Sequence, residues 1–166
     1  MSDDAPARHP TEFVKDFSEI AEEFHRRVAR TVWCTMATVD RKGRPRTRVI
    51  HPIWEGSTGY IATGRHSLKE KHLANNPMTS FTYWDPVHEQ IYIEAKAEWE
   101  DDPAEKQRVW DLYKNTPPPL GYDPQMIWRG GVEDPEYGLL KLTPWRIELW
   151  SIGQLMQGKP PQVWRP

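Results

Sequence analysis

The chain has 166 residues, with 22 lysines and arginines against 24 aspartates and glutamates, for a net charge of −2. This length fits one domain with its own core, and the charge balance excludes an overall basic field that recruits nucleic acid or anionic membranes. The single cysteine, Cys34, favours a reducing compartment, and the acidic start lacks the apolar stretch of a secretory signal. We therefore expect a cytoplasmic protein with a flexible N-terminus over residues 1–10, one domain over residues 11–166, and neither nucleic-acid nor membrane partners.

The first part of the domain predicts a helix followed by an antiparallel meander. Apolar residues recur at three- and four-residue steps between Thr11 and Arg30, which is the period of a helix with one buried face. β-branched and aromatic residues then favour strands separated by the turn sequences DRKG and EGSTG. These strands are expected over residues 32–39, 46–54 and 60–63.

A short helix and two longer strands follow the meander. Ser67 and Glu70 have the spacing of a capping box, and the sequence NNP ends the helix that they begin. Strands are expected over residues 78–84 and 87–99. The second of these alternates apolar and polar residues, which indicates one buried face.

The last part of the chain predicts a third helix and the closing strands. Asp102, Pro103 and Glu105 have the pattern of a capped helix start, and the helix is expected to run to about Asn115. After a proline-rich connection, strands are expected over residues 139–143 and 146–151. Six or seven short strands and three helices indicate a mainly β, α+β fold, a closed or partly closed antiparallel barrel with helices at its rim.

The sequence GRHSLKEK places four basic residues, Arg65, His66, Lys69 and Lys71, around the expected start of the second helix. Cations are disfavoured there by the helix dipole, whereas a phosphate gains both from the dipole and from the free N–H groups. Arg44, Arg46 and Arg48 add three cations on one face of the expected strand. Residue types alone leave two interpretations open, a solvated charged surface and an anion site.

The order of these pieces resembles the FMN-binding split-barrel superfamily typified by pyridoxamine 5′-phosphate oxidase. The resemblance runs from about Trp33 to Ser151, through CTMATVDRKGRP, RTRVIHPIW, GYIATG, SLKEKHLANNP and TSFTYW. It implies an FMN-binding split β-barrel that acts as a flavin oxidoreductase and forms a homodimer. It also implies cofactor-binding residues: Arg48, Ser67 and Lys69 for the phosphate, Val49, Ile50, Ile61, Ala62 and Thr63 along the ring, and Gln90 with Trp150 at the ring across the dimer.

The departures from this pattern concern the substrate. Vitamin-oxidising members carry a lysine where this chain has Ile53, and an Arg-x-His where it has SIGQLMQG. A site for a phosphorylated substrate loses charge-assisted hydrogen bonds without those cations. We therefore expect an oxidoreductase that transfers a hydride or electrons to a small organic substrate and is not a pyridoxamine phosphate oxidase.

Several alternatives stay open at this point. The deazaflavin coenzyme F-420 is the second cofactor considered, with its longer anionic tail meeting Arg65 and Lys71. Two further alternatives are a flavin-binding stress or storage protein without turnover, and a barrel that binds no cofactor and only mediates contacts. No catalytic acid or base is assigned, and the histidines lack the spacing of a metal site. Cys34 is interpreted as a buried, inert thiol, and the connection over residues 115–131 either covers the cofactor or braces a dimer.

Overall fold

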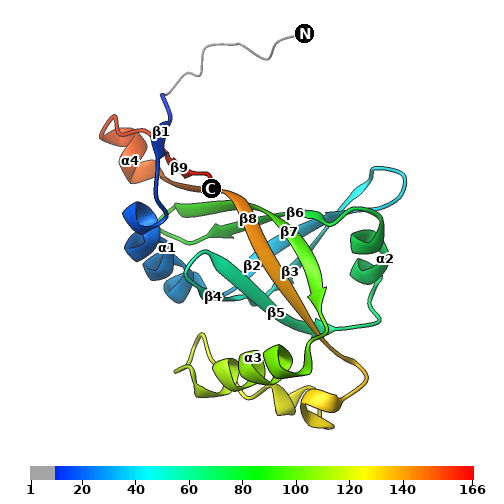
Figure 1. The fold of residues 1–166 in the computed structure, drawn as a ribbon. Coiled ribbons are helices and arrows are strands. Elements are labelled where there is room, and N and C mark those ends of the chain that lie inside the picture. Colours follow the sequence, from blue (N-terminus) through cyan, green and yellow to red (C-terminus); the bar gives the residue numbers. More distant parts are fainter. Residues whose placement is uncertain (1–9) are drawn as a thin grey trace.

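The computed structural model describes residues 10–166, and the N-terminus predicted to be flexible lies outside them except for Pro10. The fold is mainly β with an α+β composition, built on one nine-stranded sheet (Figure 1). The strands are β1 (Glu12–Val14), β2 (Cys34–Val39), β3 (Pro45–Ile50), β4 (Ile53–Glu55), β5 (Thr58–Gly64), β6 (Met78–Trp84), β7 (Glu89–Glu100), β8 (Tyr137–Ser151) and β9 (Gln162–Trp164). The helices are α1 (Ser18–Thr31), α2 (Leu68–Asn75), α3 (Pro103–Asn115) and α4 (Ile152–Met156), with 3-10 turns η1 (Pro124–Met126) and η2 (Gly131–Glu133).

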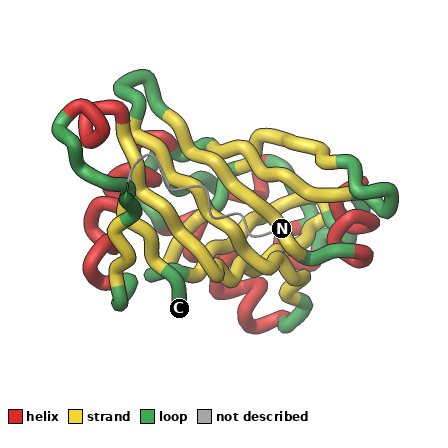
Figure 2. Tube along the Cα trace, turned by 90° about the horizontal axis from the view of Figure 1, so that it is seen from above, coloured by secondary structure: helices red, strands yellow, loops and turns green. Residues whose placement is uncertain are grey.

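The sheet is organised around the long strand β8. This strand pairs with β7 on one side, while its other side pairs first with β5 and then with β9. From β7 the sheet continues through β6 and β2 to β3. The path does not close into a barrel, and the parallel pair β1–β9 makes the sheet mixed. Figure 2 shows the helices at the periphery of the strands, as expected.

Three predicted boundaries are wrong. The helix predicted from Thr11 begins at Ser18, because residues 12–14 form β1 against β9. The strand predicted over residues 46–54 is two strands, β3 and β4, interrupted at His51 and Pro52. The two predicted closing strands are one strand, β8, which passes Pro144 by a register shift against β7.

Other elements match the sequence closely. The strand predicted over residues 78–84 is β6, and α3 spans Pro103–Asn115 with the Asp102 carboxylate accepting a hydrogen bond from the Glu105 backbone N–H at 3.0 Å. The predicted alternation in β7 is confirmed, because Ile91, Ile93 and Ala95 are fully buried. β1, β9 and α4 have no counterpart among the predicted elements.

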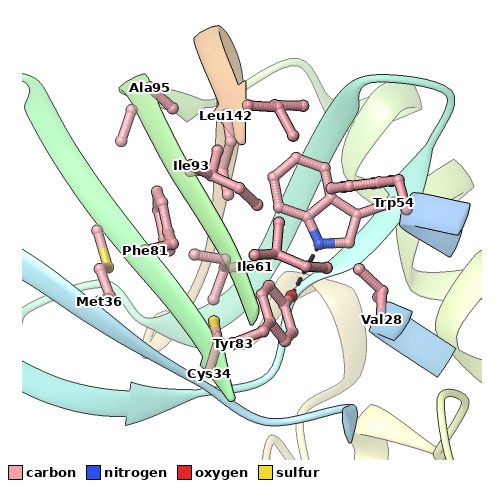
Figure 3. Close-up of a cluster of buried hydrophobic side chains, with 14 of the residues drawn as sticks. Val28, Cys34, Met36, Trp54, Ile61, Phe81, Tyr83, Ile93, Ala95 and Leu142 are labelled. Carbon is pink, nitrogen blue, oxygen red and sulfur yellow. Dashed lines mark hydrogen bonds between the residues drawn. The ribbon is translucent and has the colours of Figure 1, made fainter. Parts of the chain in front are cut away.

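Two apolar clusters hold the sheet in its curved form. The larger lies inside the curve, where the Trp54 indole N–H donates to the Tyr83 hydroxyl at 2.9 Å among buried aliphatic side chains (Figure 3). The smaller lies between α3 and the strands β4, β5 and β8, and contains Ile53, Tyr60 and Tyr113. α3 therefore fixes the β4–β5 hairpin from outside, next to the candidate site described below.

Candidate functional site

A small basic pocket lies where β3 meets the start of α2. It has a volume of about 250 Å³ and is lined by Arg46, Thr47, Arg48, Ser67, Leu68 and Lys69. Lys69 is only 7% exposed, and its ammonium group donates to the Ser67 hydroxyl at 2.7 Å. Burial, together with the nearby Arg48 charge, lowers the pKa of Lys69. No carboxylate is among the described residues that line this pocket, so its cations are not neutralised there.

Arg48 is held in place from one side only. Its Nη2 donates to the Thr38 hydroxyl at 2.7 Å, and that hydroxyl lies 2.9 Å from Nδ1 of the buried His72. Its Nη1 is buried and has no hydrogen-bond partner among the described residues. Burial, with a smaller contribution from Arg46, lowers the pKa of Arg48. A buried guanidinium donor without a partner beside a buried ammonium group fits a phosphate, which accepts several charge-assisted hydrogen bonds.

The structure corrects the capping box predicted at Ser67. The Ser67 side chain does not cap α2, and the Glu70 N–H bonds the Ser67 carbonyl instead of the hydroxyl. The hydroxyl is occupied by the buried ammonium group of Lys69, which needs a hydrogen-bond acceptor more than the solvated helix start does. The Ser67 side chain therefore contributes to the lining of the basic pocket and does not cap the helix.

A larger apolar pocket of about 430 Å³ begins further along the same strand. Val49 and Ile50 of β3 and Ile61, Ala62 and Thr63 of β5 form its floor, which places five predicted residues in one cavity. The other lining residues are Trp33, His51, Pro119, Tyr122, Met126 and Ile127. The connection over residues 115–131 therefore lines one side of this pocket, and its expected role of covering a cofactor stays a prediction.

β3 joins the two pockets directly. Residues 46–48 line the basic pocket and residues 49–51 line the apolar pocket. A molecule with an anionic group at one end and a planar apolar ring at the other can therefore lie along β3. The sequence alone does not assign Trp33 to the site, and it favours an ordinary surface or flavin-pocket histidine for His51, as for the other histidines. The one visible signal for His51 was Pro52, which removes a backbone donor and interrupts the strand there.

Gln90 and Trp150 lie apart from both pockets. They face each other across β7 and β8, and Gln90 also lies opposite Trp84 of β6. Their backbone carbonyls accept hydrogen bonds from Nη1 of Arg27, at 2.9 and 2.7 Å, so α1 holds this end of the two strands. One chain alone does not bring Gln90 and Trp150 together with the other predicted cofactor residues.

A third, more open basic groove of about 930 Å³ adjoins the basic pocket. It lies between the β2–β3 hairpin and α2, and shares Arg46 and Leu68 with that pocket. Lys71 lines this groove, where the longer anionic tail of coenzyme F-420 was expected to meet it. Arg65 does not, because its guanidinium lies 4.4 Å over the Trp99 ring and pairs with Asp101 at 3.4 Å. The lysines and arginine of GRHSLKEK thus lie in three places: Lys69 in the basic pocket, Lys71 in the groove, and Arg65 in the contact with Trp99 and Asp101.

Other chemical groups do not form a site in the part of the chain that the structure describes. No group of three or more metal-ligating side chains occurs in residues 10–166. Burial raises the pKa of the Cys34 thiol to about 12, so it is a poor nucleophile at neutral pH. None of the described helices is long and apolar enough to cross a membrane.

Part of the chain is similar in sequence to a curated enzyme. Pyridoxine/pyridoxamine 5′-phosphate oxidase of Aliivibrio salmonicida (strain LFI1238) is 38% identical over 66 residues, which are 39% of this chain and 31% of that enzyme. The matched segment thus spans less than half of this curated relative's length.

Solved structures share the fold at low identity. A pyridoxamine 5′-phosphate oxidase-related, FMN-binding protein of Nostoc punctiforme PCC 73102 superposes with a TM-score of 0.58 at 19% identity, over 87% of this chain and 85% of that one. A structure described as an F420 reductase superposes with a TM-score of 0.53 at 16% identity, over 74% and 94%. The family model described as pyridoxamine 5′-phosphate oxidase matches residues 20–151, and the chain therefore belongs to the pyridoxamine 5′-phosphate oxidase family.

Proposed function

We propose that this protein is a flavin-dependent oxidoreductase that binds FMN and passes a hydride or electrons to a small organic acceptor. The observation that carries the proposal is the junction of the two pockets along β3. Arg48 and Lys69 offer cationic donors to a phosphate, and the apolar pocket offers a surface to a planar ring. A bound flavin would supply the redox chemistry, whereas the protein supplies binding, orientation and exclusion of water.

The binding roles follow from the contacts already present. Lys69 carries a desolvated ammonium group, so an adjacent phosphate would restore the charged form that burial disfavours. Arg48 would use its unpartnered Nη1 for the same phosphate while Nη2 stays on Thr38. The backbone of Ile61, Ala62 and Thr63 would run along the ring.

The same geometry argues against a pyridoxamine phosphate substrate. Ile53 is 4% exposed and packs under α3, so it neither offers a charge nor faces a ligand. No lysine or arginine is among the described residues that line the apolar pocket. A phosphorylated substrate bound on the ring would have no cationic partner in that pocket. The proposed acceptor is therefore an unphosphorylated molecule.

Coenzyme F-420 is the second candidate cofactor, and the basic groove favours it. A cofactor with anionic groups beyond the first phosphate would continue from the basic pocket into the groove through Arg46, toward Arg44 and Lys71. Asp40 and Glu70 also line the groove, so a tail there would meet carboxylates as well as cations. FMN has no anionic group beyond its phosphate and would not reach the groove. Lys71→Ala therefore separates the two cofactors, because only F-420 binding should weaken.

We propose further that the active form is a homodimer. Trp33, Val49 and Trp84 are 57%, 67% and 53% exposed, which is unusual for large apolar side chains. Gln90 lies directly opposite Trp84 on the neighbouring strand. A second copy on this face would bury the apolar side chains and bring its Gln90 and Trp150 to the ring, as the family resemblance implies.

The test is direct. Purified protein should take up FMN, become yellow and release FMN on denaturation, and light scattering should give a dimer at micromolar concentration. With a supplied two-electron donor that reduces the bound FMN in the absence of oxygen, each cycle should reduce one small quinone to its hydroquinone and regenerate oxidised FMN, over many turnovers, whereas a storage protein would not turn over. A colourless protein that binds neither FMN nor F-420 would overturn the proposal.

A further inference from the structure

His51 is the one site residue whose side chain leaves a polar atom unexplained in the apolar pocket. It lies between β3 and β4 and lines the pocket beside Val49 and Ile50. Its Nε2 is buried, and the described residues offer it no hydrogen-bond partner. Leaving such an atom unpaired costs about 1–3 kcal/mol. A fold that keeps this cost at a ligand pocket is expected to recover it when the ligand is bound.

The imidazole ring of His51 packs against two aromatic rings, and the backbone of His51 is fixed by a third aromatic residue. Its centroid lies 5.3 Å from the Tyr122 ring at 37°, and 4.9 Å from the Trp33 ring at 54°. The Tyr113 hydroxyl fixes the backbone, because it lies 3.0 Å from the His51 carbonyl. Burial lowers the pKa of His51 and outweighs the opposite effect of a hydrogen bond with the Leu120 backbone, so the ring is neutral at physiological pH and has one nitrogen that donates and one that accepts.

Trp33 is the cover over this imidazole. In a single chain the Trp33 side chain is more than half exposed. Tyr122, by contrast, belongs to the connection over residues 115–131 and packs against Tyr113 with the ring planes tilted by 58°. Trp33 is also aimed by a strained turn: Val32 has φ 62° and ψ −60°, and the Trp33 N–H bonds the Thr31 carbonyl at 2.7 Å. That geometry is rare, and unfavourable for a β-branched residue. Strain of this kind concentrates where a side chain must be placed for function.

We propose that a planar heteroaromatic ring enters the apolar pocket by displacing the Trp33 indole, and that Nε2 of His51 forms a hydrogen bond with the polar edge of that ring. His51 is then the positioning residue that selects a ring with a hydrogen-bonding edge over a purely apolar one. The inference rests on the proposed function, since the ring in question is that of the flavin-type cofactor.

Riboflavin tests this inference, because it carries the ring without the phosphate and so reports on the apolar pocket alone. His51→Leu should weaken riboflavin binding about three- to tenfold, the range of one neutral hydrogen bond, and should shift the visible absorption of the bound ring. His51→Gln keeps a polar nitrogen near Nε2 and should retain affinity within about twofold. The matched control is His66→Leu, at an exposed histidine outside the apolar pocket, which should change nothing.

Unfolding provides the second readout. His51→Leu removes an unpaired buried polar atom, so its free energy of unfolding should equal or exceed that of the wild type. Wild-type riboflavin affinity and spectrum in His51→Leu would overturn the inference while the proposed function stands, provided that Lys69→Ala still weakens FMN binding. Failure of the wild type to bind riboflavin, FMN and F-420 alike would overturn both.

Discussion

The two pockets that meet on β3 are built in different ways. The basic pocket is small, and its polar groups are side chains from two neighbouring elements. Neither the buried Lys69 nor the partly buried Arg48 has a carboxylate partner in the described pocket lining. The apolar pocket is larger, and its walls come from β3, β5, the residue before β2 and the connection over residues 115–131. We expect charge to anchor a ligand at the basic pocket and shape to select it at the apolar pocket. A ligand that spans both pockets would then be bound by two nearly independent contributions.

The largest expected effect concerns a second anion. The described lining of the apolar pocket holds no lysine or arginine, and the candidate ligand-binding cations lie in the basic pocket and the adjoining groove. Pyridoxamine phosphate on the FMN-loaded protein should react with an efficiency lower by roughly a hundred- to ten-thousandfold than on a dedicated oxidase, because two charged hydrogen bonds are missing. Steady-state oxidation assays measure this. Turnover comparable to a dedicated oxidase would show that another cation, with Arg129 and Lys159 as candidates in the late segment, holds the substrate phosphate.

The next effect concerns Arg48 and separates the anion from the ring. Arg48→Ala removes the unpartnered Nη1 donor together with the bond to Thr38. FMN affinity should fall about ten- to 150-fold, the value of a charge-assisted hydrogen bond, while riboflavin affinity stays within about twofold. Isothermal titration measures both. Equal losses for the two ligands would mean that Arg48 shapes the apolar pocket instead of binding phosphate.

A substitution at Tyr113 tests the support of the apolar pocket, because this residue contacts the backbone of β5 without lining the pocket itself. Its buried hydroxyl lies 2.9 Å from the Tyr60 carbonyl and accepts a bond from the Ala62 N–H at 3.4 Å. Tyr113→Phe leaves these buried groups unpaired and should lower the free energy of unfolding by about 1–3 kcal/mol. Riboflavin binding should weaken as the floor of the pocket loosens. Tyr137→Phe is the control, because the buried Tyr137 hydroxyl has no hydrogen-bond partner among the described residues and Tyr137 lines neither pocket.

The smallest effect is a pH dependence. The pKa of Lys69 is lowered in the free protein, and a bound phosphate would raise it by favouring the charged form. FMN affinity should therefore be constant below the lowered pKa and fall a few-fold as pH rises through it, in the range below the ordinary lysine value near 10.4. Lys69→Met should bind weakly and lose this decline. An identical decline in Lys69→Met would assign the titration to another group.

The sequence predicts the basic pocket better than the apolar one, for a physical reason. The family resemblance implies Arg48, Ser67 and Lys69 as phosphate residues, and the cations of GRHSLKEK and of residues 44–48 add a local signal that fits an anion site as well as a solvated surface. The walls of the apolar pocket depend on tertiary placement. Trp33 is positioned by the strained turn at Val32, and Arg65 is drawn to Trp99 by a long-range cation–π contact, and neither can be read from local pattern.

The fold shows the same division. The buried face of β7 and the start of α3 are predicted closely because a period-two run and a capped helix start are local signals. The three-residue strands β1 and β9 exist only because they pair with each other, and β8 continues through Pro144 because β7 absorbs a register shift. Such features follow from the assembled sheet.

We propose that β3 joins a phosphate site to a ring site. Titration of the wild type and of Lys69→Ala with both FMN and riboflavin tests this junction. We expect FMN to bind the wild type more tightly than riboflavin, and Lys69→Ala to lower FMN affinity about ten- to 150-fold while changing riboflavin affinity by less than about twofold. Equal affinities of the wild type for the two ligands, or equal losses in Lys69→Ala, would contradict it.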